Sequence, residues 1–149
     1  MQLKHYLTGG AFYANADVVF DQRLPIRLRD ASPKSALAVN TEVCSEEEVK
    51  VIVENNQITK ISKKLDPNKC LGEFVGIAWF SAQLAKPFKN SLEYLVEQKN
   101  ITSDYFELAL DHIACDQPLP IVDISDLPCL EIDFPEDLKK AREQLAQQL

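Results

Sequence analysis

The stretch GEFVGIAWF, residues 72–80, is a continuous apolar run with a single carboxylate, Glu73, near its start. Such a run is typical of a strand that is covered on both faces, because a strand with one wet face alternates apolar and polar residues. We therefore expect residues 72–80 to form the central strand of a sheet. Glu73 should pair with a lysine or lie at the edge of a site, since an unpaired buried carboxylate is costly.

The segment before this strand predicts a β-hairpin. Residues 49–54 and 57–62 resemble two strands, and Asn55 and Asn56 between them tolerate the positive φ angles of a two-residue turn.

The rest of the chain alternates short strands with helices. We expect strands at residues 11–20, 36–39, 120–124 and 129–132, and helices at residues 24–29, 81–98, 104–114 and from Pro135 onward. Within 81–98 the main helix should begin near Pro87, because proline is tolerated in the first turn but not in a helix interior. Asp104 and Glu107 resemble a helix cap. These elements predict a single α/β domain over residues 1–149, with a mixed, mainly parallel sheet.

Charge is distributed unevenly along the 149 residues, which carry a net charge of −7. Residues 100–138 contain ten acids and no lysine or arginine. This composition argues against nucleic acid as a partner, because the acids would repel a phosphate backbone. Crowded carboxylates instead suit a hard cation such as Mg²⁺.

Other features exclude further classes of protein. No segment approaches the ~18 apolar residues of a membrane span, so no membrane association is expected. The four cysteines include no C-x₂-C pair, and the chain has only two histidines. These features predict the reduced thiols of a cytoplasmic protein and not a zinc site.

Asp17 and the neighbouring lysines Lys63 and Lys64 are candidate site residues. Asp17 precedes the apolar run at residues 18–20, and a carboxylate at a sheet edge can hold a metal bound to phosphate. A lysine on a loop above the sheet can hold a phosphate as a point charge. In each case a solvated surface residue is the alternative, and the sequence leaves open which lysine faces the crevice.

The segment EIDFPEDL, residues 131–138, places four carboxylates around a helix start. Glu136 and Asp137 follow Pro135 and fit the stabilisation that acids give to a helix N-terminus. Glu131 and Asp133 precede the helix, so they can serve a neighbouring site or be structural.

Taken in order, four segments resemble the later part of the nucleoside-triphosphate transferase family. They are ADVVFD (16–21), ISKKL (61–65), GEFVGIAWFS (72–81) and VDISDLPCLEIDFPEDLKKARE (122–143). The sugar-phosphate nucleotidyltransferases and the phosphocholine and phosphonate cytidylyltransferases are the most similar branches, with EIDFPEDL the most specific motif. The resemblance spans roughly residues 11–145 and implies a Rossmann-like fold.

The resemblance implies transfer of a nucleoside monophosphate from a nucleoside triphosphate to a phosphorylated sugar or alcohol, with release of pyrophosphate. It implies catalytic roles for Asp17, Asp133 and Lys63, with the two acids jointly holding Mg²⁺ and Lys63 contacting the substrate phosphate. Substrate binding is expected from Glu73, Lys64 and Glu131.

One departure from the family pattern concerns the nucleotide. The Gly-rich loop that cradles the triphosphate in complete members has no counterpart in these residues, so the transferase is expected to be incomplete on its own. A homodimer, or a partner that supplies the nucleotide-binding half, would cover the open sheet edge beside residues 11–20. The alternative function is a non-catalytic ligand-binding or assembly module derived from the same family. A smaller departure is Phe134, which stands where a capping threonine is common.

Overall fold

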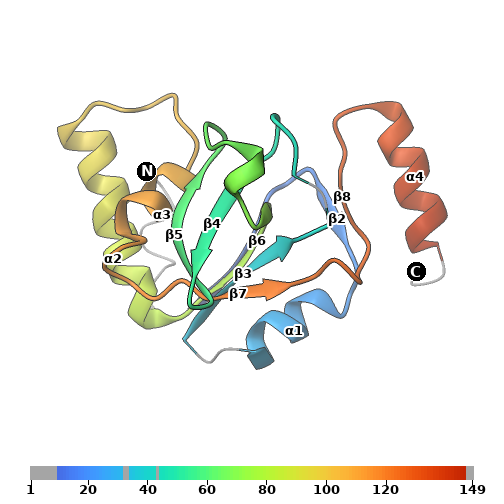
Figure 1. Cartoon of the computed structure of the whole chain (residues 1–149), viewed down its shortest axis with the longest axis horizontal. Helices are drawn as coiled ribbons and strands as arrows, with labels where there is room; N and C mark the ends of the chain where they lie inside the picture. The colour runs from blue at the N-terminus through green and yellow to red at the C-terminus, as the bar shows by residue number, and fades with distance from the viewer. Residues whose placement is uncertain (1–9, 32–33, 43, 147–149) are drawn as a thin grey trace.

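The computed structural model describes residues 10–31, 34–42 and 44–146 (Figure 1). Its strands are β1 (Ala11–Ala14), β2 (Val18–Phe20), β3 (Ser35–Asn40), β4 (Lys50–Glu54), β5 (Gln57–Ser62), β6 (Gly72–Phe80), β7 (Ile121–Asp123) and β8 (Cys129–Glu131). Its helices are α1 (Leu24–Ala31), α2 (Ala82–Glu93), α3 (Glu107–Ile113) and α4 (Pro135–Leu145), with a 3₁₀ turn η2 (Pro67–Lys69) and a π-helical turn η3 (Tyr94–Gln98).

Strand β6 is the centre of the main sheet, as its apolar run predicts. The strand order is β5-β4-β6-β3-β7, and β1 also pairs with β6. Strand β3 follows one edge of β6 over most of its length. The other edge is shared, because β4 pairs with Gly72 and Glu73 while β1 pairs with Ile77 through Phe80. The predicted β4–β5 hairpin is also confirmed, with Asn55 and Asn56 at φ 51° and 61°.

The prediction of a mainly parallel sheet is wrong. Only the β3–β7 pair is parallel, and every other ladder among the described residues is antiparallel. A continuous apolar run reports burial on both faces and not strand direction. Strand β6 is buried on both faces because helices cover each side, although its neighbours run antiparallel to it.

Two hydrophobic cores lie on opposite faces of the sheet. On one face, Leu24 and Leu28 of α1 pack with Ile77. On the other, Phe88 of α2 and Leu110 of α3 pack against the sheet. Figure 1 shows the same arrangement, with α1 on one side of the strands and α2 and α3 on the other.

The strand predicted at residues 11–20 is two strands. The chain turns at residues 15–17, where the N–H of Asn15 donates to the carbonyl of Gly76 at 2.9 Å. Strand β1 stays in the main sheet, whereas β2 leaves it and forms a separate two-stranded antiparallel sheet with β8. Helix α4 lies beside this small sheet (Figure 1).

The helices follow the apolar periodicity with three corrections. Helix α2 begins at Ala82, five residues earlier than expected, because Ser81 caps it and Pro87 is accommodated inside it. The expected cap at Asp104 and Glu107 does not form, because α3 begins only at Glu107 and no side chain caps it. Helix α4 begins at Pro135 as predicted, and the spacing of Leu138, Ala141 and Leu145 predicts one buried face, but Leu138 is 40% exposed. Among the described ranges, no helix is both long and apolar enough to cross a bilayer.

Candidate functional site

Five of the six predicted site residues line one cleft of about 820 Å³. We call it the acidic cleft; the five are Asp17, Lys63, Glu73, Glu131 and Asp133. They come from the turn before β2, the loop after β5, the start of β6, the end of β8 and the segment before α4. These segments are far apart along the chain, so only the fold brings their side chains to one cavity.

Lys64 is the sixth predicted residue, and it is not among the described residues that line the cleft. Its backbone N–H donates to the Ser62 hydroxyl at 3.1 Å in an exposed turn. The sequence leaves open which of the two adjacent lysines faces the cleft. Lys63 is the one that faces it.

The β2–β8 ladder brings the two aspartates to the same end of the small sheet. Val18 pairs with Glu131, and the N–H of Ile132 donates to the carbonyl of Asp17 at 2.8 Å. Asp133 therefore follows the last backbone hydrogen bond by one residue, and both acids line the same cleft. The ladder thus joins two residues that are 116 positions apart in sequence.

A bulge in β6 fixes the turn that presents Asp17. The β3–β6 register shifts between Leu37 and Val39, and on β6 the residues bypassed by this shift include Gly76, whose φ is 73°. The carbonyl of Gly76 accepts from the N–H of Asn15, and the side-chain oxygen of Asn15 accepts from the Tyr13 hydroxyl at 2.7 Å. A glycine is needed here because residues that carry a side chain rarely adopt this φ.

Crowded carboxylates dominate the electrostatics of the cleft. Burial, with the negative charges of Glu48 and Glu131, raises the pKa of Glu73 to about 7. Burial and the charges of Asp133 and Asp17 raise the pKa of Glu131. The charges of neighbouring carboxylates therefore disfavour ionisation of Glu73 and Glu131, and a bound cation would relieve this repulsion.

Lys50 anchors residues 45–48, which we call the acidic loop, at the rim of the cleft, and no feature of the sequence indicates this role. The lysine is fully buried, and its ammonium donates to the carbonyls of Ser45, Glu46 and Glu48 at 3.2, 2.8 and 3.1 Å. This loop carries Glu47 and Glu48, which line the cleft. A lysine within a strand is expected to be exposed, so only the structure reveals the anchor.

Glu107 was also missed as a site residue, because the sequence suggested a helix cap. It lines the acidic cleft, is only 6% exposed, and its Oε2 has no hydrogen-bond partner among the described residues. Burial raises its pKa. A buried carboxylate oxygen without a hydrogen bond is costly, which makes Glu107 a candidate site residue.

Two of the cleft carboxylates, Asp17 and Asp133, partly meet the requirements of a Mg²⁺ ion. Within the described ranges, no three His, Cys, Asp or Glu side chains are grouped so as to hold a metal ion by themselves. Mg²⁺ is commonly held by one or two carboxylates together with substrate phosphates. Asp17 and Asp133 therefore suit a cation that arrives with a phosphate ligand, and do not form a complete protein site.

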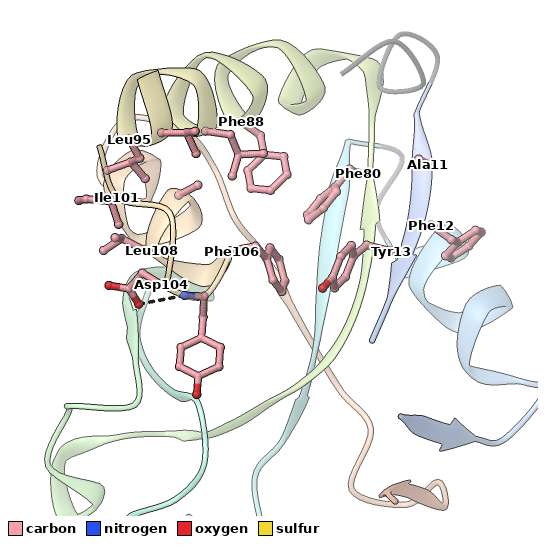
Figure 2. Close-up of a pocket in the computed structure, with 14 residues that line it drawn as sticks. Ala11, Phe12, Tyr13, Phe80, Phe88, Leu95, Ile101, Asp104, Phe106 and Leu108 are labelled. Carbon is pink, nitrogen blue, oxygen red and sulfur yellow. Dashed lines mark hydrogen bonds between the residues drawn. The ribbon is translucent and has the colours of Figure 1, made fainter. Parts of the chain in front are cut away.

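A second, apolar cavity of about 460 Å³ lies next to the acidic cleft. Figure 2 shows its lining, in which Tyr13 and Phe106 face one another with ring centroids 4.1 Å apart. Tyr13, Tyr105 and Phe106 line both cavities. Of the described residues in this lining, Asp104 alone is charged, and its carboxylate accepts the N–H of Tyr105 at 2.9 Å. The chemistry of the predicted site therefore belongs to the acidic cleft, and the apolar cavity adjoins it through an aromatic wall.

Comparison with known proteins identifies similar folds. No protein-family model matches the sequence, and no curated protein does either. Among solved structures, the chain is similar to the CTP:phosphocholine cytidylyltransferase of Streptococcus pneumoniae, at a TM-score of 0.72 and 15% identity, covering 96% of this chain and 61% of that one.

Two further structures show the same relationship. The inositol-1-phosphate CTP transferase of T. maritima has a TM-score of 0.66 at 23% identity, over 93% of this chain and 56% of that one. A putative glucose-1-phosphate thymidylyltransferase of Bacillus anthracis has a TM-score of 0.65 at 14% identity, over 99% and 58%. The chain spans less than two thirds of the length of each. Over the portion it spans, the chain has the fold of the nucleotidyltransferases.

Proposed function

We propose that this chain is the acceptor-binding and metal-binding part of a nucleotidyltransferase. The reaction transfers a nucleoside monophosphate from a nucleoside triphosphate to a phosphorylated sugar or alcohol and releases pyrophosphate. One observation carries the proposal: Asp17 and Asp133 flank the same hydrogen-bonded end of the β2–β8 ladder and share a cleft with Lys63.

Each cleft residue has a role that its chemistry supports. Asp17 and Asp133 would hold Mg²⁺ by their carboxylates, and the bound ion would neutralise phosphate charge. Lys63 binds the phosphate of the acceptor as a point charge. Glu73 and Glu131 lie in the same cleft and hold the organic part of the acceptor, which orients the phosphate for attack on the α-phosphate.

The proposal assigns nucleotide binding elsewhere. No Gly-rich phosphate loop is visible in the sequence, and the chain spans 61% of the length of the pneumococcal enzyme. We therefore expect these residues to bind a phosphorylated acceptor with Mg²⁺ and to turn over only when a nucleotide-binding half is supplied.

Titration calorimetry with Mg²⁺ and glucose 1-phosphate, phosphocholine or inositol 1-phosphate tests the binding. Pyrophosphate release with CTP, with and without a nucleotide-binding half from a similar enzyme, tests turnover. Asp17→Asn and Asp133→Asn should each weaken Mg²⁺-dependent binding by about 10-fold or more, because each removes a carboxylate from the cation. Asp116→Asn is the matched control, since Asp116 is exposed and is not among the cleft residues.

The outcomes separate the candidate functions. Mg²⁺-dependent binding that both cleft variants lose and the control retains supports the proposal. Binding that the cleft variants leave intact contradicts it. Binding without turnover under every supplementation identifies a non-catalytic ligand-binding module instead.

A further inference from the structure

We propose that the apolar cavity is a second subsite for the acceptor, reached from the acidic cleft past Tyr105. The acceptor is then a phosphomonoester whose phosphate binds in the cleft and whose distal part, a hydrocarbon group, enters the cavity. Glu73 and Glu131 contact the portion next to the phosphate. This inference rests on the proposed function, because it names the class of acceptor that the chain takes.

The lining of the apolar cavity supplies the first observation. The cavity has a volume of about 460 Å³, and its described side chains are apolar apart from Asp104 and two tyrosines. Figure 2 shows aromatic side chains toward one side and aliphatic side chains toward the other, namely Phe80, Phe88 and Phe106 and then Leu95, Ile101 and Leu108. Such a surface gains free energy when a hydrocarbon group replaces water against it.

The polar groups of this lining do not require a polar ligand. Asp104 and Tyr105 are exposed, so water solvates them where the cavity meets the surface. The hydroxyl of Tyr13 donates to the side-chain oxygen of Asn15 at 2.7 Å. Cavities without polar partners stay dry and take apolar ligands, and a sugar hydroxyl buried there would lose its hydrogen bonds to water. The cavity therefore favours a hydrocarbon group over a sugar ring.

The position of Lys63 supplies the second observation. Its ammonium lies 4.9 Å from the centroid of the Tyr105 ring, and Tyr105 lines both the acidic cleft and the apolar cavity. A phosphate that binds Lys63 therefore stands one aromatic ring away from the cavity. A short carbon chain on that phosphate is enough to pass Tyr105 and to reach the apolar side chains behind it.

The path between the two cavities runs past Tyr105 and not past the other shared residues. Tyr13 and Phe106 are half-buried and pack against one another with ring centroids 4.1 Å apart, so they close the inner part of the wall. Tyr105 is 63% exposed, and exposed side chains change rotamer within nanoseconds. When a phosphate draws the Lys63 ammonium off the Tyr105 ring, the face of that ring becomes free for the carbon chain.

A series of ligands that differ only in chain length tests the subsite. We would titrate the chain with ethyl, butyl, hexyl and octyl phosphate in Mg²⁺ at about pH 8, where the phosphates are dianions. Affinity should rise about 3-fold for each added methylene until the cavity is filled. 1-Octanol, which lacks the phosphate, should bind about 10-fold more weakly than octyl phosphate or worse.

Two tryptophan variants locate the binding of the carbon chain. Leu92 is half-buried and lines the cavity, so Leu92→Trp fills part of it and should end the gain in affinity at a shorter chain. Ile26→Trp is the matched control, because Ile26 of α1 is exposed and is not among the residues that line the cavity. This variant should preserve the full series. If Leu92→Trp does not fold, Val96→Trp, at another half-buried residue of the lining, decides.

The outcomes separate this subsite from the proposed function. Affinity that does not rise with chain length in the unaltered chain overturns the subsite, and the proposed function stands if ethyl phosphate still needs Mg²⁺ and Asp17. A rise that the cavity variant leaves unchanged shows binding to another apolar surface and also overturns the subsite. 1-Octanol that binds as tightly as octyl phosphate shows a cavity separate from the cleft, which overturns its role in acceptor binding. Failure of every phosphate to bind overturns both proposals.

Discussion

The N–H of Ile132 donates to the carbonyl of Asp17 at 2.8 Å, one step beyond the Val18–Glu131 pair that ends the β2–β8 ladder. This bond belongs to the small two-stranded sheet and not to the main one. The two aspartates of the proposed metal site therefore depend on a short ladder, on the turn before β2 and on the segment before α4. Changes to these parts should alter the site while leaving the main sheet folded.

Replacement of Gly76 by alanine tests the turn. Gly76 has a φ of 73°, and a Cβ there would lie 2.4 Å from the side-chain nitrogen of Asn15. We expect Gly76→Ala to lower the free energy of unfolding by about 2 kcal/mol, from backbone strain and this contact together. Displacement of the turn should also weaken Mg²⁺-dependent phosphate binding. Urea denaturation and calorimetry measure the two effects.

The double variant Asn15→Ala/Gly76→Ala separates the two causes. It removes the close contact but keeps the unfavourable φ, so it should recover only part of the lost stability. A Gly76→Ala chain whose stability stays within about 0.5 kcal/mol of the original would show that the bulge does not hold the turn.

Lys50 is expected to be essential for the acidic loop. Lys50→Met keeps the length of the side chain but leaves the carbonyls of Ser45, Glu46 and Glu48 without their ammonium donor. Loss of hydrogen bonds to a buried charged group should cost about 3 kcal/mol in urea denaturation. Lys69→Met, on the exposed turn η2, should change stability by less than about 0.5 kcal/mol. Equal effects of the two substitutions would contradict the anchoring role of Lys50.

Local signals account for what the sequence could predict. The apolar run of β6 and the Asn55-Asn56 turn depend on nearby residues, so both were found in the structure. The motifs around Asp17, Lys63 and Asp133 likewise pointed to residues that line one cleft. Each of these signals lies within a few consecutive residues.

Features that depend on distant partners were not predictable. Strand direction depends on how the chain returns to β6, and an apolar run is the same for either direction. Lys50 is a different case, because its partners are the carbonyls of Ser45, Glu46 and Glu48 just before it in the chain, and every residue has such a carbonyl, so no residue pattern signals the contact. Glu107 joins the cleft only because α3 packs beside the sheet, and its position in the sequence suggested a helix cap.

The missing cap of α4 can be restored. Phe134 holds the N-cap position in an extended conformation, its N–H donates to Oδ2 of Asp137 at 3.1 Å, and its own side chain offers no acceptor. Phe134→Ser would supply the second half of a capping box, because a serine hydroxyl can accept the N–H of Asp137. We expect a gain of about 1 kcal/mol in the free energy of unfolding.

Phe134→Ala is the control for loss of the ring. The Phe134 side chain is 67% exposed, so its removal alone should change stability little. If urea denaturation shows that the Phe134→Ser chain is no more stable than the Phe134→Ala chain, α4 gains nothing from the cap.

Glu73 should make stability depend on pH in a defined direction. Its pKa rises from 4.5 to about 7 in the folded chain, so the native state binds this proton more tightly than the unfolded state does. This tighter proton binding adds to the free energy of unfolding. The added stability is fully present below about pH 4.5 and is lost as the pH rises through about 7. Glu73→Gln stays neutral and lacks this loss, so it should become the more stable chain, by about 1–2 kcal/mol at about pH 8 after allowance for solvent screening.

Urea denaturation of both chains between about pH 4 and pH 8 checks this prediction. The difference in the free energy of unfolding should grow across the interval between the two pKa values and level off above it. Glu54→Gln, an exposed glutamate at the end of β4, should give a difference that stays constant over the same range. If the Glu73→Gln difference is also flat, burial does not disfavour the charged form of Glu73, and its carboxylate is then already neutralised in the free chain.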